Sequence, residues 1–174
     1  MNRFSLFLVL LLFPLLSFTQ EWKTFTDTAG KFTARYPSTW INKIKEGNRI
    51  FFTSPPDSAT DIFFENINIT VTQKNGYGTE IKVNALFPAV TDAVKKQFTD
   101  FKEERLRFFK WNGIDAAELT YSGYNKLDES LRIRTIQWYC FYKSRLYLAT
   151  FVADAAKINH NQTALKIMTG IVFK

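Results

Sequence analysis

Short turns between alternating strands constrain the fold of this 174-residue chain more than any other feature. Residues 105–108 alternate charged and apolar side chains, and the Asn112-Gly113 dipeptide that follows is typical of a two-residue hairpin turn. Residues 114–121 predict the returning strand, and residues 130–143 and 146–153 predict a second hairpin. Strands joined by such short turns pair antiparallel, so the sequence predicts a mostly antiparallel sheet.

An early strand ends at a proline and is followed by a tryptophan. Phe32, Ala34 and Tyr36 share one side of a period-two pattern, which predicts a half-buried strand. Pro37 has no backbone N–H to give to a central ladder, so we expect a turn there, with Trp40 folding back over the strand end.

Two helices are expected among the strands. An apolar stripe at helical spacing over residues 81–102 predicts one helix, which either starts near Pro88, with the proline in its first turn, or is preceded by a short turn. Residues 154–168 predict a second helix that ends at Gly170. Further strands are expected at residues 21–27, 49–53, 62–73 and 171–173, with an exposed loop at 54–61, a loop at 122–129, and Ile41 and Ile44 packed inside. The order predicts an α+β fold in which helices cover a mostly antiparallel sheet.

The first residues have the pattern of a secretory signal peptide. Arg3 precedes an apolar run over residues 4–16, and small residues stand at positions 17 and 19, before Gln20. The run is shorter than the roughly 20 apolar residues of a membrane-spanning helix. We therefore predict a signal peptide at residues 1–19, a single domain at 20–174, and an exported protein, periplasmic or secreted, with no stable membrane anchor after cleavage.

The charge of the chain limits its partners. Lysine and arginine total 23 against 16 acidic residues, a net charge of +7. Export separates such a basic protein from most nucleic acids, so we expect no nucleic-acid partner. An envelope protein or an anionic polymer, of unknown identity, is the expected partner.

Few residues support catalysis or metal binding. His160 is the single histidine and is expected on the surface, and Cys140 is the single cysteine and is expected to be a small buried side chain. One residue of each type cannot supply the ligands of a zinc site, and no phosphate loop or nucleophile elbow is present. We predict no catalytic residue, no cofactor and no metal site.

Carboxylate chemistry depends on contacts that spacing does not reveal. Four glutamates are candidates for a hydrolytic pair, although no spacing pairs them: Glu65, Glu103, Glu104 and Glu118. Calcium binding is open to a few loop acids that lack calcium-loop spacing: Asp57, Asp61, Asp128 and Glu129.

Two polar patterns are candidate binding surfaces. Asn66 and Asn68 share one face of a strand with Thr70, where they form either a hydrogen-bonding stripe or a solvated face. Two arginine pairs alternate along two other strands: Arg105 and Arg107, and Arg132 and Arg134. The four arginines form an anion-binding patch if the strands are neighbours, or else pair within the sheet with Glu103 or Glu118.

Several segments resemble the PsbP-like family: residues 22–27, 30–40, 51–55, 65–71, 112–117 and 170–173. The resemblance implies a compact α/β/α sandwich around an antiparallel sheet, a fold shared with a nuclear Ran-binding protein. Plant members are extrinsic lumenal subunits of photosystem II, and bacterial relatives, which this chain resembles more, are exported proteins of mostly unassigned function.

Together these patterns predict an exported, non-enzymatic PsbP-like domain that serves as a binding or interaction module of the bacterial envelope. An exposed sheet face or loop edge is the expected contact surface. The alternative is a small-ligand carrier or a carboxylate-based hydrolase with a pocket between sheet and helix.

Overall fold

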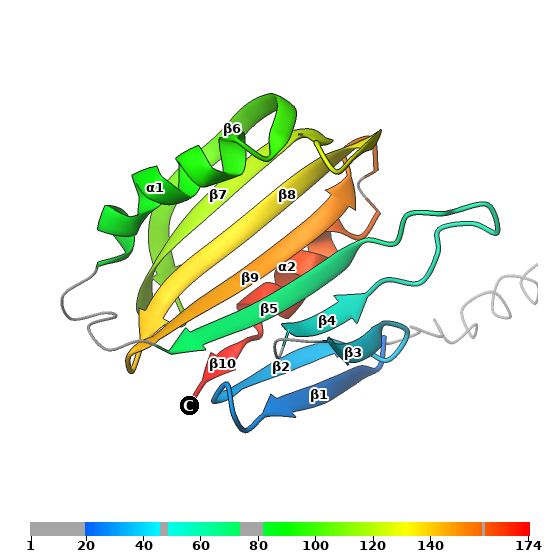
Figure 1. Ribbon diagram of the computed structural model, residues 1–174. Helices are drawn as coiled ribbons and strands as arrows, with labels where there is room; N and C mark the ends of the chain where they lie inside the picture. The colour runs from blue at the N-terminus through cyan, green and yellow to red at the C-terminus, as the bar shows by residue number, and fades with distance from the viewer. Residues whose placement is uncertain (1–19, 46–48, 74–81, 158) are drawn as a thin grey trace, which may run out of the picture.

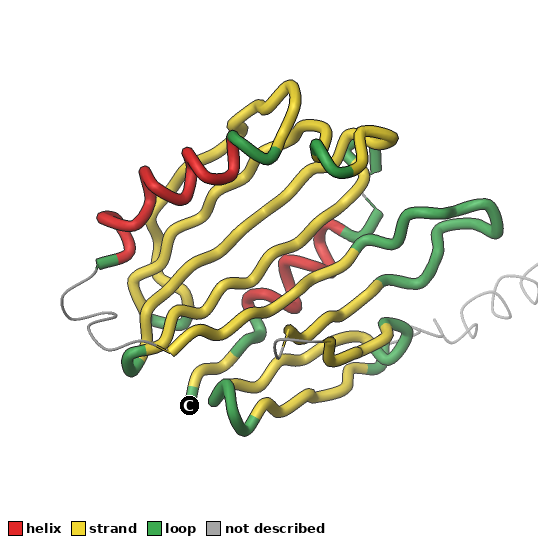
Figure 2. Tube along the Cα trace, in the orientation of Figure 1, coloured by secondary structure: helices red, strands yellow, loops and turns green. Residues whose placement is uncertain are grey.

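The computed structural model describes residues 20–45, 49–73, 82–157 and 159–174, which form two antiparallel sheets and two helices (Figures 1 and 2). The strands before the first helix are β1 (Trp22–Asp27), β2 (Phe32–Pro37), β3 (Ile41–Lys45), β4 (Arg49–Thr53) and β5 (Asn66–Gln73). Helix α1 (Val83–Lys95) is followed by β6 (Phe98–Trp111), β7 (Ile114–Asn125), β8 (Asp128–Tyr142) and β9 (Arg145–Asp154). Helix α2 (Asn161–Thr169) and β10 (Val172–Phe173) complete the described chain.

The larger sheet has seven strands in the order β3-β4-β5-β9-β8-β7-β6, and every neighbouring pair is antiparallel. The predicted hairpins are confirmed. Asn112 and Gly113 have φ of 49° and 82°, as a type I′ turn requires, and Lys143 and Ser144 also have positive φ between β8 and β9.

The two faces of this sheet are covered differently (Figure 1). On one face, α1 lies over β6, β7 and β8, where Phe87 and Val94 pack against Leu119 and Tyr139. On the other face, α2 and a three-stranded sheet, β1-β2-β10, enclose the larger core. The predicted antiparallel sheet with helices is therefore confirmed, but a full α/β/α sandwich is not, because a second small sheet shares one layer and α1 covers only part of its face.

The predicted core of the early strand is confirmed. Phe32 and Ala34 are fully buried, and Trp40 folds back into the same core. The backbone N–H of Trp40 donates to the carbonyl of Pro37 at 3.0 Å. Cys140 is also buried, as predicted, and burial raises the pKa of its thiol.

Several predicted boundaries are wrong. Helix α1 ends at Lys95, and Phe98 already belongs to β6; the helical spacing continues because helix and strand face the same core. Pro88 lies inside α1 rather than in its first turn, on the exposed side of the helix. Ile41 and Ile44 form an exposed edge strand instead of packing inside.

Three other boundaries differ: two elements begin later than predicted, and β7 is longer because its residues pair with both β6 and β8. Strand β5 begins at Asn66 rather than at 62, β7 continues to Asn125 through the predicted loop, and α2 begins only at Asn161. The predicted signal peptide, residues 1–19, lies outside the described residues. None of the helices in the described part of the chain has the length and apolar character needed to cross a membrane.

Candidate functional site

On the face of the larger sheet that carries α1, no helix of the described chain lies over β4 and β5 (Figure 1). Asn66 and Asn68 lie on this face, because they alternate with Ile67 and Ile69, which are buried on the other. Asn66 Nδ2 donates to Phe64 O at 3.3 Å, whereas the amide of Asn68 makes no hydrogen bond to a described residue. The amide of Asn68 is therefore available to a ligand.

Neighbouring strands extend this polar surface into a row. Asn68 is paired with Phe51 on β4 and with Thr150 on β9, and Thr150 is paired with Gln137 on β8. Paired residues of antiparallel strands share a face, and Gln137 Nε2 donates to Thr150 Oγ1 at 3.5 Å. We call this surface the open face, and its residues are Phe51, Asn66, Asn68, Thr70, Gln137 and Thr150.

Three cations border the open face on the edge strands. Lys43 is paired with Phe51, Lys45 is paired with Arg49, and Lys45 Nζ lies 4.7 Å from the centroid of the Phe51 ring. No carboxylate of a described residue forms an ion pair with Lys43, Lys45 or Arg49. Within the described residues, β3 and β4 therefore add positive charge that no carboxylate pairs with, beside neutral amides and hydroxyls.

The four candidate arginines lie on the opposite face of the sheet. Strand β7 separates Arg105 and Arg107, on β6, from Arg132 and Arg134, on β8. The structure brings the four onto one face, but each guanidinium has a carboxylate partner. Glu118 pairs with Arg105 and Arg107, Asp100 with Arg132, and Glu104 with Arg134.

Glu118 is the centre of this charged group. It is 3% exposed, and its Oε2 accepts bonds from Arg107 Nη2 at 2.7 Å and from Trp138 Nε1 at 2.8 Å. Its Oε1 accepts a bond from Thr120 Oγ1 at 3.4 Å. Charge-assisted bonds of this kind contribute about 1.5–3 kcal/mol each, so the surroundings of Glu118 are those of a structural ion pair.

A second charged group forms where residues 54–65, the loop between β4 and β5, meet the segment before α2 (Figure 2). The carboxylate of Asp61 accepts the N–H of Asp57 at 2.9 Å and the ammonium of Lys157 at 2.6 Å. The bond from Lys157, followed by that from Asp57, lowers the pKa of Asp61, and the same pair raises the pKa of Lys157. The loop is thus folded around Asp61 and tied to Lys157.

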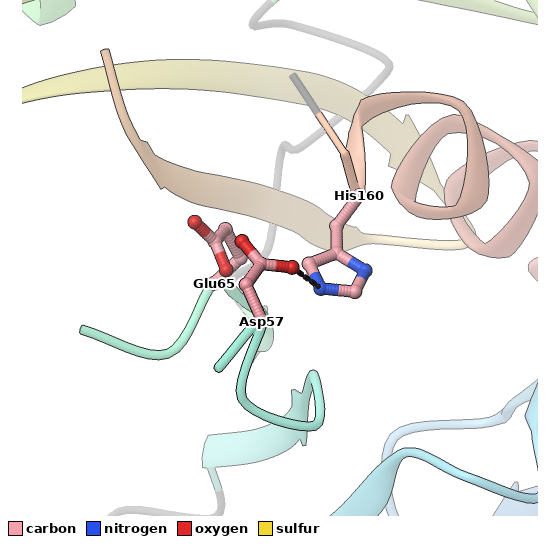
Figure 3. A group of neighbouring side chains, drawn as sticks. All are labelled: Asp57, Glu65 and His160. Atoms are coloured by element: carbon pink, nitrogen blue, oxygen red, sulfur yellow. Dashed lines mark ion pairs between the residues drawn. The ribbon is translucent and has the colours of Figure 1, made fainter. Parts of the chain in front are cut away.

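Asp57, Glu65 and His160 come together beside this pair (Figure 3). The carbonyl of His160 accepts the N–H of Ala164 at 2.8 Å, so the start of α2 holds the residue in place. Nε2 of His160 lies 3.0 Å from Asp57 Oδ1, and one donor atom of each residue lies within 4.8 Å of the other two. Trp40 supports the imidazole ring edge-on, with centroids 5.7 Å apart.

Glu65 is the most buried member of this group, with 1% of its surface exposed. Its Oε2 accepts a bond from Ser54 Oγ at 3.3 Å, but its Oε1 has no hydrogen-bond partner among the described residues. A buried carboxylate oxygen without a partner is costly, so Glu65 differs sharply from Glu118.

The prediction that His160 is a surface residue is wrong. Its side chain is 16% exposed and its Nε2 is buried, because Trp40 and the loop cover the ring. One sequence signal was available, since Asp57, Asp61 and Glu65 recur at every fourth position of one loop. No spacing could connect them to a histidine near the other end of the chain.

The centres of the interfaces between helices and sheet are filled by apolar side chains, but a groove of about 740 Å³ opens where Val83 and Asn84 of α1 meet Phe108 of β6. Phe87 and Val94 of α1 and Ile167 and Met168 of α2 all pack in the hydrophobic core. The four candidate glutamates do not converge on one another: Glu103 is exposed on β6, Glu104 and Glu118 are paired with arginines, and Glu65 lies in the loop between β4 and β5. Burial acts to raise the pKa of Glu104, but hydrogen bonds from Arg134 and Ser122 lower it by more. The pKa of Glu104 therefore lies below its usual value.

Comparison with known proteins identifies the fold. No protein-family model matches the chain, and no curated protein matches its sequence. Cyanobacterial PsbP from Synechocystis sp. PCC 6803 superposes with a TM-score of 0.60 at 11% identity, covering 90% of this chain and 94% of its own. The Ran-binding protein Mog1p of Saccharomyces cerevisiae gives 0.58 at 8% identity, covering 89% and 96%.

Two further solved structures are similar. LpqN of Mycobacterium tuberculosis, a protein involved in cell envelope biogenesis, gives a TM-score of 0.55 at 10% identity and covers 91% of this chain and 87% of its own. A protein from Bacteroides thetaiotaomicron gives 0.59 at 15% identity, and the chain, 87% of which is matched, spans only 48% of that protein's length. The chain therefore has the fold of PsbP and Mog1, which confirms the resemblance to PsbP-like proteins inferred from its sequence.

Proposed function

We propose that this protein is an exported, non-enzymatic binding module of the bacterial envelope, and that it binds an anionic polymer across the open face. The observation that carries the proposal is the half-buried row of amides and a hydroxyl on β5, formed by Asn66, Asn68 and Thr70, which is bordered by Lys43, Lys45 and Arg49. The row has no titratable side chain, so it is suited to binding rather than to proton transfer.

The chemistry of the open face favours a hydroxyl-rich polyanion. Asn68 offers a free amide donor and acceptor, and Phe51 offers a ring face beside the lysines. The edge cations supply attraction that falls with salt. The envelope role described for LpqN and the net charge of +7 support the same assignment.

The test is binding of untagged protein to a labelled acidic polysaccharide, polygalacturonate, with neutral dextran as the comparison. Lys43→Glu is expected to weaken binding about tenfold, and Asn68→Ala severalfold. Lys166→Glu, on the exposed side of α2, changes the net charge equally and is expected to leave affinity within about twofold.

Equal losses for Lys43→Glu and Lys166→Glu would reduce the interaction to net charge and overturn the open face as the binding surface. Failure to bind polygalacturonate more tightly than dextran would overturn the anionic polymer as the partner.

A further inference from the structure

We propose that Asp57, Glu65 and His160 bind a divalent transition-metal cation, with Zn²⁺ as the type case. This inference goes beyond the proposed function and stands without it, since the group lies on the β4–β5 loop and the start of α2 rather than on the open face (Figure 3).

The donor atoms of the three residues lie nearly as close together as the ligands of a bound metal ion do. One donor atom from each residue lies within 4.8 Å of the other two. Ligand atoms of a tetrahedral zinc ion at about 2.0–2.2 Å stand roughly 3.5 Å apart. Nε2 of His160 and Oδ1 of Asp57 are already 3.0 Å apart, yet Nε2 makes no aligned hydrogen bond. An imidazole nitrogen and a carboxylate oxygen that face each other with no aligned hydrogen bond between them among the described residues are suited to sharing a cation.

The unpartnered oxygen of Glu65 is an independent sign of a missing positive partner. Glu65 is 1% exposed, Ser54 binds only its Oε2, and Oε1 has no hydrogen-bond partner among the described residues. Figure 3 shows the carboxylate of Glu65 next to that of Asp57. A metal ion bound here would satisfy Oε1 and separate the two negative charges.

The charge balance also favours a dication. Three carboxylates gather in this region, from Asp57, Asp61 and Glu65, and Lys157 is the one ammonium that pairs with them in the described chain. Lys157 uses Asp61 and the Oδ2 atom of Asp57, at 2.6 and 3.7 Å, and leaves Oδ1 facing His160. The three carboxylates and the ammonium of Lys157 together carry an excess of two negative charges, which a divalent cation neutralises.

The type of donor selects the class of metal. Imidazole with carboxylates suits zinc and neighbouring transition metals, whereas magnesium and calcium prefer oxygen donors alone. The groove beside the loop, about 660 Å³ in volume, is lined by Asp57, Asp61 and Lys157. A bound ion would tie the loop to α2 directly before Asn66, where β5 begins.

The test uses untagged protein treated with a chelator and then titrated with Zn²⁺. Because His160 is the only histidine, the imidazole nitrogen signals in a long-range ¹H–¹⁵N spectrum report on this site alone. We expect those signals to shift to completion at one equivalent of zinc, and calorimetry to give one ion per chain. Equimolar Mg²⁺ is expected to leave the imidazole signals unchanged.

His160→Gln and Glu65→Gln are each expected to weaken zinc binding at least about a hundredfold, since even changes outside the ligand shell cost 10–100-fold. Asp115→Asn, at an exposed acid paired with Lys110, is the matched control and is expected to bind zinc as the wild type does. Circular dichroism checks that the variants are folded.

Imidazole signals that do not move with equimolar zinc would overturn the proposal whatever the variants do. Zinc affinity that is unchanged in folded His160→Gln and Glu65→Gln would overturn it as well.

Discussion

Glu65 and Glu118 are both buried glutamates, but their surroundings are opposite in charge. Glu118 lies in the middle of the sheet, where the register places Arg107 on the next strand directly opposite, and Trp138 on the other side completes its partners. Glu65 lies at the end of a loop, where its neighbours Asp57 and Asp61 are also acids.

The difference teaches how a buried carboxylate can be assigned a role. A carboxylate whose hydrogen bonds and charge are satisfied within its own sheet contributes to stability, as Glu118 does. A carboxylate buried among other acids with an unpartnered oxygen is not explained by folding alone, and Glu65 is of this kind.

The largest expected effect comes from breaking the satisfied site. Glu118→Gln removes the charge that pairs with Arg107, and the free energy of unfolding is expected to fall by about 2 kcal/mol. The estimate is below that for a fully buried pair because Arg107 is 43% exposed. Urea denaturation measures the change, and a fall below about 0.5 kcal/mol would contradict the role given to Glu118.

Removing the ammonium of Lys157 tests the charge balance around Glu65. Lys157→Met leaves Asp61 and Asp57 without their ammonium partner, so the region becomes more negative. Zinc affinity is expected to rise roughly tenfold, because the ammonium of Lys157 no longer repels the zinc ion across the short distance between them. Calorimetry measures the affinity, with Lys166→Met as the control; weaker zinc binding in Lys157→Met would be inconsistent with the charge balance described.

The same substitution at the two glutamates should act in opposite directions. In the presence of a chelator, Glu65→Gln removes one of three clustered negative charges and adds a donor beside Asp57. The free energy of unfolding is expected to rise by about 1 kcal/mol, whereas it falls for Glu118→Gln. Urea denaturation of both variants in one buffer decides the comparison, and a loss of stability in Glu65→Gln would show that Glu65 is satisfied after all.

The smallest expected effect is a pH dependence from Asp61. Its pKa is lowered below 3.8 in the folded protein, so its contribution to stability is present above its unfolded pKa and disappears as the pH falls through the lower folded value. With a chelator present, the difference in Tm between wild type and Asp61→Asn is expected to be largest near pH 6 and to shrink below about pH 4. A difference that stays constant from pH 6 to pH 2.5 would exclude this linkage.

Most of the fold could be predicted because strands and turns carry local signals. Alternation placed Phe32 and Ala34 in the core, and Asn112-Gly113 marked a hairpin. The errors fall where tertiary pairing overrides a local pattern. Strand β6 takes Phe98 from the predicted helix, because the strand faces the same core as the helix.

The candidate sites were less predictable. Asn66 and Asn68 were found because alternation along one strand shows which residues share a face. The partners of Glu65 were not, since His160 is nearly a hundred positions away and belongs to the start of a helix. The predicted absence of a metal site rested on the count of histidines and cysteines for zinc and on the missing calcium-loop spacing of the loop acids, and neither criterion detects a histidine and carboxylates that folding brings together.

The sequence by itself determined that this chain forms an antiparallel sheet with apolar cores and short turns, because side-chain periodicity and turn conformation are properties of adjacent residues. Only the tertiary structure decided which carboxylates receive a cation. That depends on strand order and on where loops meet helices, and interactions between charges act through space rather than along the chain.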